Sequence, residues 1–138
     1  MPSAPERQLA RLRDRYQQHA VRLAKVGFLL KGSVGQRFLP CGSPGCRCHA
    51  DPPQLHGPYW QWTSKVSGKT VSRMLSEEQA RRYLEWIENA KQFEQIVNEL
   101  HDISSRADAL LRARERVLRK RHDTSRARTQ SGKSAAQR

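Results

Sequence analysis

The feature that most constrains this chain is a short stretch that holds all three of its cysteines, Cys41-Gly-Ser-Pro-Gly-Cys46-Arg-Cys48. Four residues separate Cys41 from Cys46, one separates Cys46 from Cys48, and His56 follows after seven more. Because glycine and proline fill the first gap, the thiols lie where the backbone bends and can converge on one ion. The sequence therefore predicts a zinc site with three thiolates and one imidazole. The predicted ligands are Cys41, Cys46, Cys48 and His56.

Other interpretations of these residues stay open at this point. Free cysteines often fill space in a core, although the loop composition here argues against that. A disulfide is disfavoured, because three is an odd number of cysteines and no secretory leader precedes them, which indicates a reducing cytoplasm. A catalytic thiol is a further alternative. His49 adjoins Cys48 and is the alternative to His56 as the fourth ligand.

Two helical patterns flank this region. A capping box at Ser3-Ala-Pro-Glu6 predicts an N-terminal helix over residues 1–27, and a second box at Ser76-Glu-Glu-Gln79 predicts a long helix over residues 76–121. Apolar residues in both helices alternate in steps of three and four, which is the heptad pattern of a coiled-coil seam. The first seam comprises Leu9, Leu12, Tyr16, His19, Leu23 and Val26, and the second comprises Phe93, Ile96, Leu100, Ile103, Ala107, Leu110 and Val117.

The two seams predict that the helices fold back on each other as an antiparallel hairpin, with an intermolecular coiled coil as the alternative. We also expect a homodimer, because the second seam is longer than the first. A histidine on such a seam is more often packed or hydrogen-bonded than a metal ligand, so His19 is not assigned to a metal site.

Between the helices, residues 28–75 are predicted to form a Cys/His β module. Its expected strands are residues 33–39, 59–66 and 70–75, and Ser67-Gly68-Lys69 supplies the last hairpin turn. Alternation on the second strand places Trp60 and Trp62 on one face, where we expect the long helix to cover them. Three short strands are marginal alone, so bound zinc would assist folding. The predicted fold class is α+β, with a three-stranded antiparallel module flanked by two helices that form a coiled-coil-like hairpin.

The formal net charge of +13 is unevenly distributed. Residues 1–76 contribute +9, residues 77–111 contribute −4 and residues 112–138 contribute +8, the last part including a predicted disordered basic tail over residues 122–138. This excess of cations indicates a polyanionic partner, DNA or, alternatively, RNA. The candidate nucleic-acid contacts are Arg47, Lys65, Lys69, Arg73, Arg119, Lys120, Arg121, Arg126 and Arg128.

The sequence offers little support for an enzyme. Asp51 is the only acid inside the β module, and the segment Val66-Ser-Gly-Lys-Thr70 lacks the first glycine of a phosphate-binding loop. The His-x-Glu and Cys-x-x-Cys elements of zinc deaminases are also absent. A metal-dependent enzyme is therefore the least favoured function.

The stretch from Cys41 to Arg73 resembles a family of small bacterial and archaeal proteins with no assigned activity. The shared motifs are the cysteine cluster, His56-Gly-Pro-Tyr59, and Gly68-Lys-Thr followed by Ser72-Arg73. The resemblance extends from about Gly27 to near Leu100. It implies an association with mobile elements, close to transposases or integrases, and hence a DNA-handling accessory role.

These observations together predict a non-catalytic DNA-binding accessory protein that assists a transposase or integrase in transposition or DNA recombination. The alternative is a structural adaptor that binds a recombinase, or a second copy of itself, through its helical seams. No apolar run is long enough to span a bilayer, so we expect a cytoplasmic protein, associated with the nucleoid if it binds DNA. High salt should separate the two functions, because charge-driven binding weakens steeply with salt.

Overall fold

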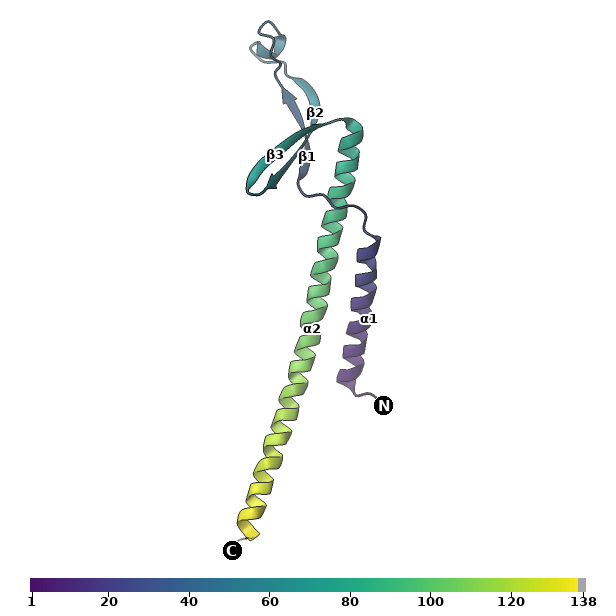
Figure 1. Cartoon of the computed structure of the whole chain (residues 1–138), viewed down its shortest axis with the longest axis vertical. Helices are drawn as coiled ribbons and strands as arrows, with labels where there is room; N and C mark the ends of the chain where they lie inside the picture. Colours follow the sequence, from purple (N-terminus) through teal and green to yellow (C-terminus); the bar gives the residue numbers. More distant parts are fainter. Residues whose placement is uncertain (137–138) are drawn as a thin grey trace. The chain divides into compact units, whose positions relative to one another are not determined.

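The computed structural model describes residues 1–136, which form two helices and one antiparallel sheet (Figure 1). The elements in chain order are α1 (Ala4–Lys25), β1 (Ser33–Leu39), the short 3-10 helix η1 (Arg47–His49), β2 (His56–Val66), β3 (Lys69–Leu75) and α2 (Glu77–Ala136). The chain divides into two compact units. The sheet unit is Lys25–Gln95, and the helical unit combines Met1–Ala24 with the part of α2 from Ile96 onward.

The sheet of the sheet unit has the strand order β1-β2-β3, with every neighbouring pair antiparallel, which confirms the predicted meander. Trp62 of β2 pairs with Val34 of β1 and with Arg73 of β3, so these three residues share one face. The hairpin between β2 and β3 turns at Ser67 and Gly68, both with positive φ (50° and 78°). Two positive φ values in a two-residue loop match the twist of the flanking strands, which fixes this register.

The core of the sheet unit lies between the sheet and the first turns of α2. It consists of Trp62, Leu75, Ala80, Tyr83 and Ile87. The Trp62 and Tyr83 rings meet edge to face at 5.9 Å, and the Trp62 indole N–H donates to the Lys31 carbonyl at 2.9 Å. The prediction that α2 covers the tryptophan face is confirmed for Trp62, which is buried, whereas Trp60 is half-buried at its edge.

Both predicted capping boxes are present. The Gln79 N–H donates to the Ser76 hydroxyl at 3.1 Å, and the Ser76 N–H donates to the Gln79 side-chain oxygen at 2.9 Å. At the start of α1 the Ser3 N–H donates to the Glu6 carboxylate at 2.6 Å. That backbone hydrogen bond, assisted by the Ser3 hydroxyl, lowers the pKa of Glu6. These bonds satisfy amide groups that a helix start otherwise leaves unpaired.

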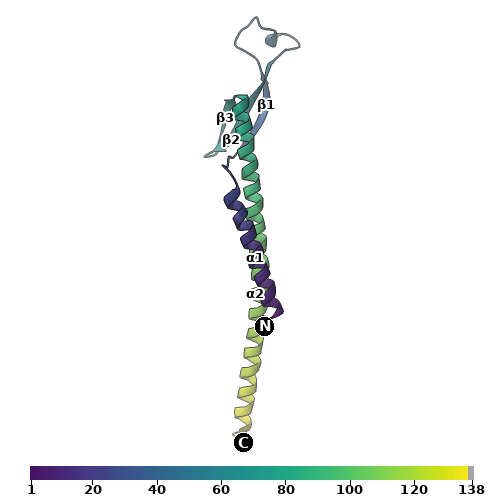
Figure 2. The ribbon, with the colours of Figure 1, turned by 90° about the vertical axis from the view of Figure 1, so that its right-hand side faces the viewer.

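In the helical unit, α1 lies antiparallel to the part of α2 that follows Ile96 (Figure 2). Ile96, Leu100 and Ile103 are buried, as the seam predicts. His19 Nδ1 lies 2.9 Å from a Glu99 carboxylate oxygen, so this histidine has a polar partner within the helix pair. The predicted coiled-coil-like hairpin is therefore confirmed. Tyr16 and Val117 differ from the other seam residues because their side chains are exposed.

The long helix extends beyond the predicted boundary. We expected a disordered basic tail from residue 122, but α2 continues to Ala136. Alanine, arginine and glutamine favour helix, whereas Gly132 and the Ser and Thr residues do not. No proline interrupts this stretch, and the hydroxyls of Thr124 and Thr129 donate to carbonyls one turn earlier within the helix. Residues 137 and 138 of the predicted tail lie outside the described residues. No helix within residues 1–136 combines the length and apolar composition needed to cross a membrane.

Candidate metal centre

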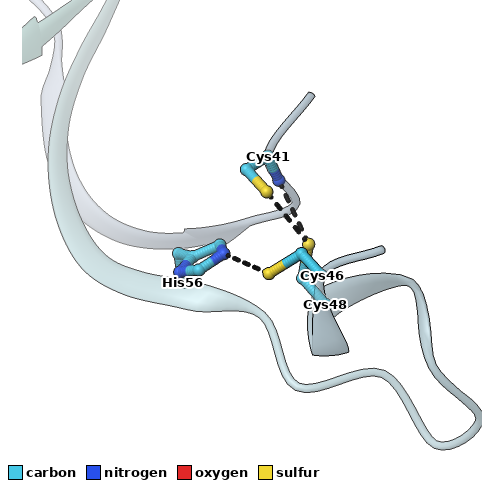
Figure 3. Close-up of side chains that lie close together, drawn as sticks. All are labelled: Cys41, Cys46, Cys48 and His56. Atoms are coloured by element: carbon cyan, nitrogen blue, oxygen red, sulfur yellow. Dashed lines mark hydrogen bonds between the residues drawn. The ribbon is translucent and has the colours of Figure 1, made fainter. Parts of the chain in front are cut away.

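The strand pairing of β1 and β2 brings the ends of the cysteine loop together. Leu39 at the end of β1 pairs with His56 at the start of β2, which closes the loop between them. Cys41 follows β1, whereas Cys46 and Cys48 lie at η1, whose first residue is Arg47. The fold therefore delivers ligands from a strand end, a helical turn and the facing strand to one point, as Figure 3 shows.

The four predicted ligands are close enough to share one ion. Their donor atoms all lie within 4.8 Å of one another. Cys41 Sγ is 3.5 Å from Cys48 Sγ, and Cys46 Sγ is 3.2 Å from His56 Nε2. Zinc bonds to sulfur at ~2.3 Å in a tetrahedron, which corresponds to sulfur–sulfur separations of about 3.8 Å. The observed spacing thus fits a four-coordinate ion after small side-chain adjustments, and the group could hold a metal ion.

The surroundings of the thiols differ in a way that suits metal binding. The Ser43 backbone N–H, and then the Cys48 thiol, donate to Cys41 Sγ and lower the pKa of Cys41 to about 6. At Cys48 the Cys41 backbone N–H favours the thiolate, but burial and the neighbouring thiols outweigh it and raise the pKa of Cys48. Thiolates are the form that binds metals. One thiolate is therefore available near neutral pH, and a bound cation would favour ionisation of the buried partner.

The structure separates the two candidate histidines. His56 Nε2 faces Cys46, whereas His49 Nε2 lies 2.8 Å from the Cys41 carbonyl oxygen. His49 therefore bonds to the backbone of a ligand residue instead of joining the donor group. Backbone bonds from Cys46 to Ser43 and from Gln54 to Arg47 hold the rest of the loop.

Gly57 is needed where the loop returns to the sheet. Its φ is +139°, and a Cβ atom there would lie 2.7 Å from the Arg37 carbonyl oxygen. Both the backbone conformation and the close approach to β1 exclude larger side chains. Because His56 precedes it, Gly57 helps to keep the imidazole in place beside the thiols.

The predicted nucleic-acid contacts of the sheet unit do not form one patch. Arg47 is exposed in η1, between two of the ligand cysteines. Lys65 and Lys69 are exposed near the β2–β3 turn but lie on opposite faces of the sheet, since Lys69 pairs with Val66. Arg73 donates to the Tyr83 hydroxyl at 2.8 Å and lies over the Trp62 ring at 5.5 Å. Arg73 thus has a packing role within the sheet unit.

The remaining predicted contacts lie on one exposed helix. Arg119, Lys120, Arg121, Arg126 and Arg128 belong to α2, where every residue from 111 to 136 is exposed. Our sequence interpretation did not include four other cations of the same stretch, three in the helix predicted over residues 76–121 and one in the predicted tail. The signal that the sequence offered is that Arg112, Arg114 and Lys133 each lie seven residues from a predicted contact. The missed residues are Arg112, Arg114, Arg116 and Lys133.

A comparison with models of protein families identifies the family of the chain. The family model described as a domain of unknown function, DUF6788, matches residues 5–89, and the chain belongs to this family. The matched region includes α1, the complete sheet with its cysteine loop, and the first turns of α2. No curated protein and no solved structure matches the chain.

Proposed function

For this member of the DUF6788 family, we propose a non-catalytic DNA-binding function supported by a structural zinc ion. The observation that carries the proposal is the exposed end of α2, where residues 112–136 hold nine Lys or Arg against two acids. Such a surface has the charge that phosphate backbones attract, and release of counterions from the nucleic acid would drive binding. The cytoplasm and its nucleoid are the corresponding proposed location.

Zinc is the proposed ion because of the chemistry of the four donors. Three thiolates and one imidazole form a soft set that suits zinc, whereas magnesium and calcium prefer oxygen. Four protein ligands fill a tetrahedral site and leave no position for a substrate, which supports a structural role and argues against metal catalysis. Zinc binding contributes on the order of 10 kcal/mol in small zinc modules, enough to order a loop with a small core.

An accessory role beside a transposase or integrase remains part of the proposal. Its support is the resemblance of the cysteine cluster and of the segment Gly68 to Arg73 to proteins associated with mobile elements. The rival proposal is a structural adaptor that binds a recombinase or its own copy through the seams. One observation weakens it, because α1 already covers the Ile96, Leu100 and Ile103 side of α2.

A homodimer is proposed as the assembled form. Leu111, Val117 and Leu118 of α2 are exposed apolar residues near the N-terminal end of α1. A second chain would bury them, which removes apolar area from water. Light scattering across a broad concentration range tests this proposal, and a strictly monomeric mass would refute it.

DNA binding is tested with the zinc-loaded full chain and a fluorescent duplex in an anisotropy titration. We expect the affinity to fall by ~10³-fold or more between about 50 and 200 mM salt if six or more phosphates are contacted. An adaptor that uses its apolar seams would instead bind a protein partner with little dependence on salt. Absence of duplex binding at about 50 mM salt would overturn the proposed function.

A further inference from the structure

The cations at the end of α2 form two rows. Arg114, Arg121 and Arg128 follow one another at intervals of seven residues and are called the Arg121 row. The Arg126 row has the same interval and consists of Arg112, Arg119, Arg126 and Lys133. Seven residues correspond to about two helical turns, or ~10.5 Å along the axis. Because the rows are offset by two residues, or about 200° around the helix, they lie on nearly opposite flanks.

A polar strip separates the two rows on one side of the helix. It consists of His122, Ser125 and Thr129. Ser125 lines a shallow depression with Arg121 and Arg128, and it also lines a second depression with Arg126 and Lys133. One uncharged side chain therefore lies between cations of both rows.

The polar strip can hydrogen-bond to a ligand. The Thr129 hydroxyl donates to the Ser125 carbonyl at 3.0 Å, which leaves its oxygen as an acceptor and its methyl group exposed. Imidazole and hydroxyl groups both donate and accept hydrogen bonds. Asp123, the only acid within residues 118–133, is two residues from Ser125 and hence on the side away from the strip.

The Arg121 row continues the seam that binds α1. The seam passes through the buried Leu100 and Ile103 and the half-buried Leu110, and the same alternating steps then reach Arg114, Val117 and Arg121. Ser3 and Pro5, at the start of α1, line a cleft that reaches Arg121. Arginine thus occupies seam positions next to the start of α1, and the Arg121 row is exposed.

We propose that residues 118–133 of α2 lie in the major groove of duplex DNA, an inference that rests on the proposed function. The Arg121 row binds phosphates of one backbone, the Arg126 row binds phosphates of the other, and the polar strip contacts base edges. The major groove of B-DNA is ~12 Å wide and admits an α-helix of about 10–12 Å diameter. Both walls of that groove are phosphate backbones, which matches cations on two flanks of one helix.

The same features disfavour other nucleic acids. The major groove of double-stranded RNA is deep and narrow, so side chains on a helix do not reach its bases. Proteins that bind single strands stack bases on aromatic rings, and residues 112–136 contain no Phe, Tyr or Trp. Duplex DNA is therefore the ligand that this helix fits.

The first test compares paired substitutions in the full chain. Arg121→Gln with Arg128→Gln removes part of one row, and Arg119→Gln with Arg126→Gln removes part of the other. Each pair should lower duplex affinity by ~10-fold or more and reduce the salt slope by about 2. The matched control, Arg106→Gln with Arg116→Gln, removes two charges of α2 that belong to neither row and precede residues 118–133, and it should have less than about a third of that effect.

The second test identifies the groove and separates the inference from the proposed function. Duplexes with bulky glucosyl groups on cytosine block the major groove, whereas distamycin occupies the minor groove. We expect ~10-fold or greater loss of binding on the glucosylated duplex and no change with distamycin. Equal effects of the row and control pairs, competition by distamycin, or preference for single strands or RNA would overturn the groove assignment while nucleic-acid binding survives. Failure to bind any nucleic acid would overturn both.

Discussion

The two compact units of this protein obtain their order in different ways. The sheet unit concentrates its contacts around Trp62 and Tyr83, and its largest loop converges on four potential metal ligands. The helical unit has a narrow seam between two helices and then a stretch of α2 with every residue exposed from 111 to 136. The difference shows that burial and ligand convergence define one unit, whereas the end of the other is a helix that extends from the packed seam without contacts of its own.

The largest expected effect is the loss of bound zinc when one predicted ligand is removed. Cys48→Ser removes the most buried predicted ligand, so bound zinc should fall from about one ion per chain to none, and the loop between β1 and β2 should lose protection from proteolysis. Elemental analysis and limited proteolysis measure this. The helix signal in circular dichroism should persist, because α1 and α2 do not contain the ligands.

The matched control for that variant is His49→Ala. His49 bonds to the Cys41 carbonyl but lies outside the donor group, so zinc should be retained. A protein that lacks zinc in its unmodified form, with its thiols protected and its loop ordered, would refute the metal site. Loss of zinc in His49→Ala as well would mean that this residue, and not His56 alone, contributes to binding.

The second-largest expected effect is a loss of stability when a buried seam residue of the helical unit is replaced by a charged one. Leu100→Glu places a carboxylate at a buried position and should lower the free energy of unfolding by roughly 3–5 kcal/mol. Ala109→Glu is the control, because Ala109 on the same helix is exposed and should tolerate the change. Urea unfolding at several protein concentrations distinguishes the arrangements. An intramolecular hairpin loses the same stability at each concentration, whereas a dimer becomes more sensitive on dilution.

The sequence predicted the parts of the molecule that local rules determine. Capping boxes located both helix starts, alternation located the strands, and cysteine spacing located Cys41, Cys46 and Cys48. The sequence also named His56 as the fourth ligand, with His49 as the alternative. The pairing of Leu39 with His56, a contact across the sheet that loop composition does not specify, brings His56 to the thiols.

Two further features differ from the sequence interpretation, for opposite reasons. Arg73 appeared to be a free cation in sequence, but its position opposite Trp62 and its bond to Tyr83 make it part of the packing. The end of α2 was misjudged for the opposite reason. Its composition suggested a tail, whereas α2 continues without a break from the packed seam to Ala136.

A deletion sharpens the contrast between the exposed end of α2 and the sheet unit. Removal of residues 122–138 eliminates Arg126, Arg128 and Lys133 together with the polar strip, and duplex affinity should fall by ~100-fold with a salt slope smaller by about 3. Zinc content and the thermal midpoint should stay unchanged, because residues 122–136 bury no side chain.

Replacement of Lys65 and Lys69 by Gln should lower duplex affinity less than the deletion does, since those cations lie on opposite sheet faces. The reverse ranking, with the lysine variant weaker than the deletion, would place the DNA contact on the sheet unit.

The smallest expected effect compares the two helix starts, which have capping boxes of different chemistry. The box of α1 contains the titratable Glu6, whereas the box of α2 contains the uncharged Gln79. Because the Ser3 hydrogen bonds lower the pKa of folded Glu6 below its ordinary value of 4.5, its contribution is present above that value and is lost as the pH falls through the lowered pKa. Glu6→Gln should therefore remove a small acid-induced loss of helix signal, and Gln79→Glu should introduce one at the start of α2. Circular dichroism between about pH 2 and pH 6 measures both changes. An acid transition that is identical in wild type and Glu6→Gln would show that the first turn of α1 does not depend on this carboxylate.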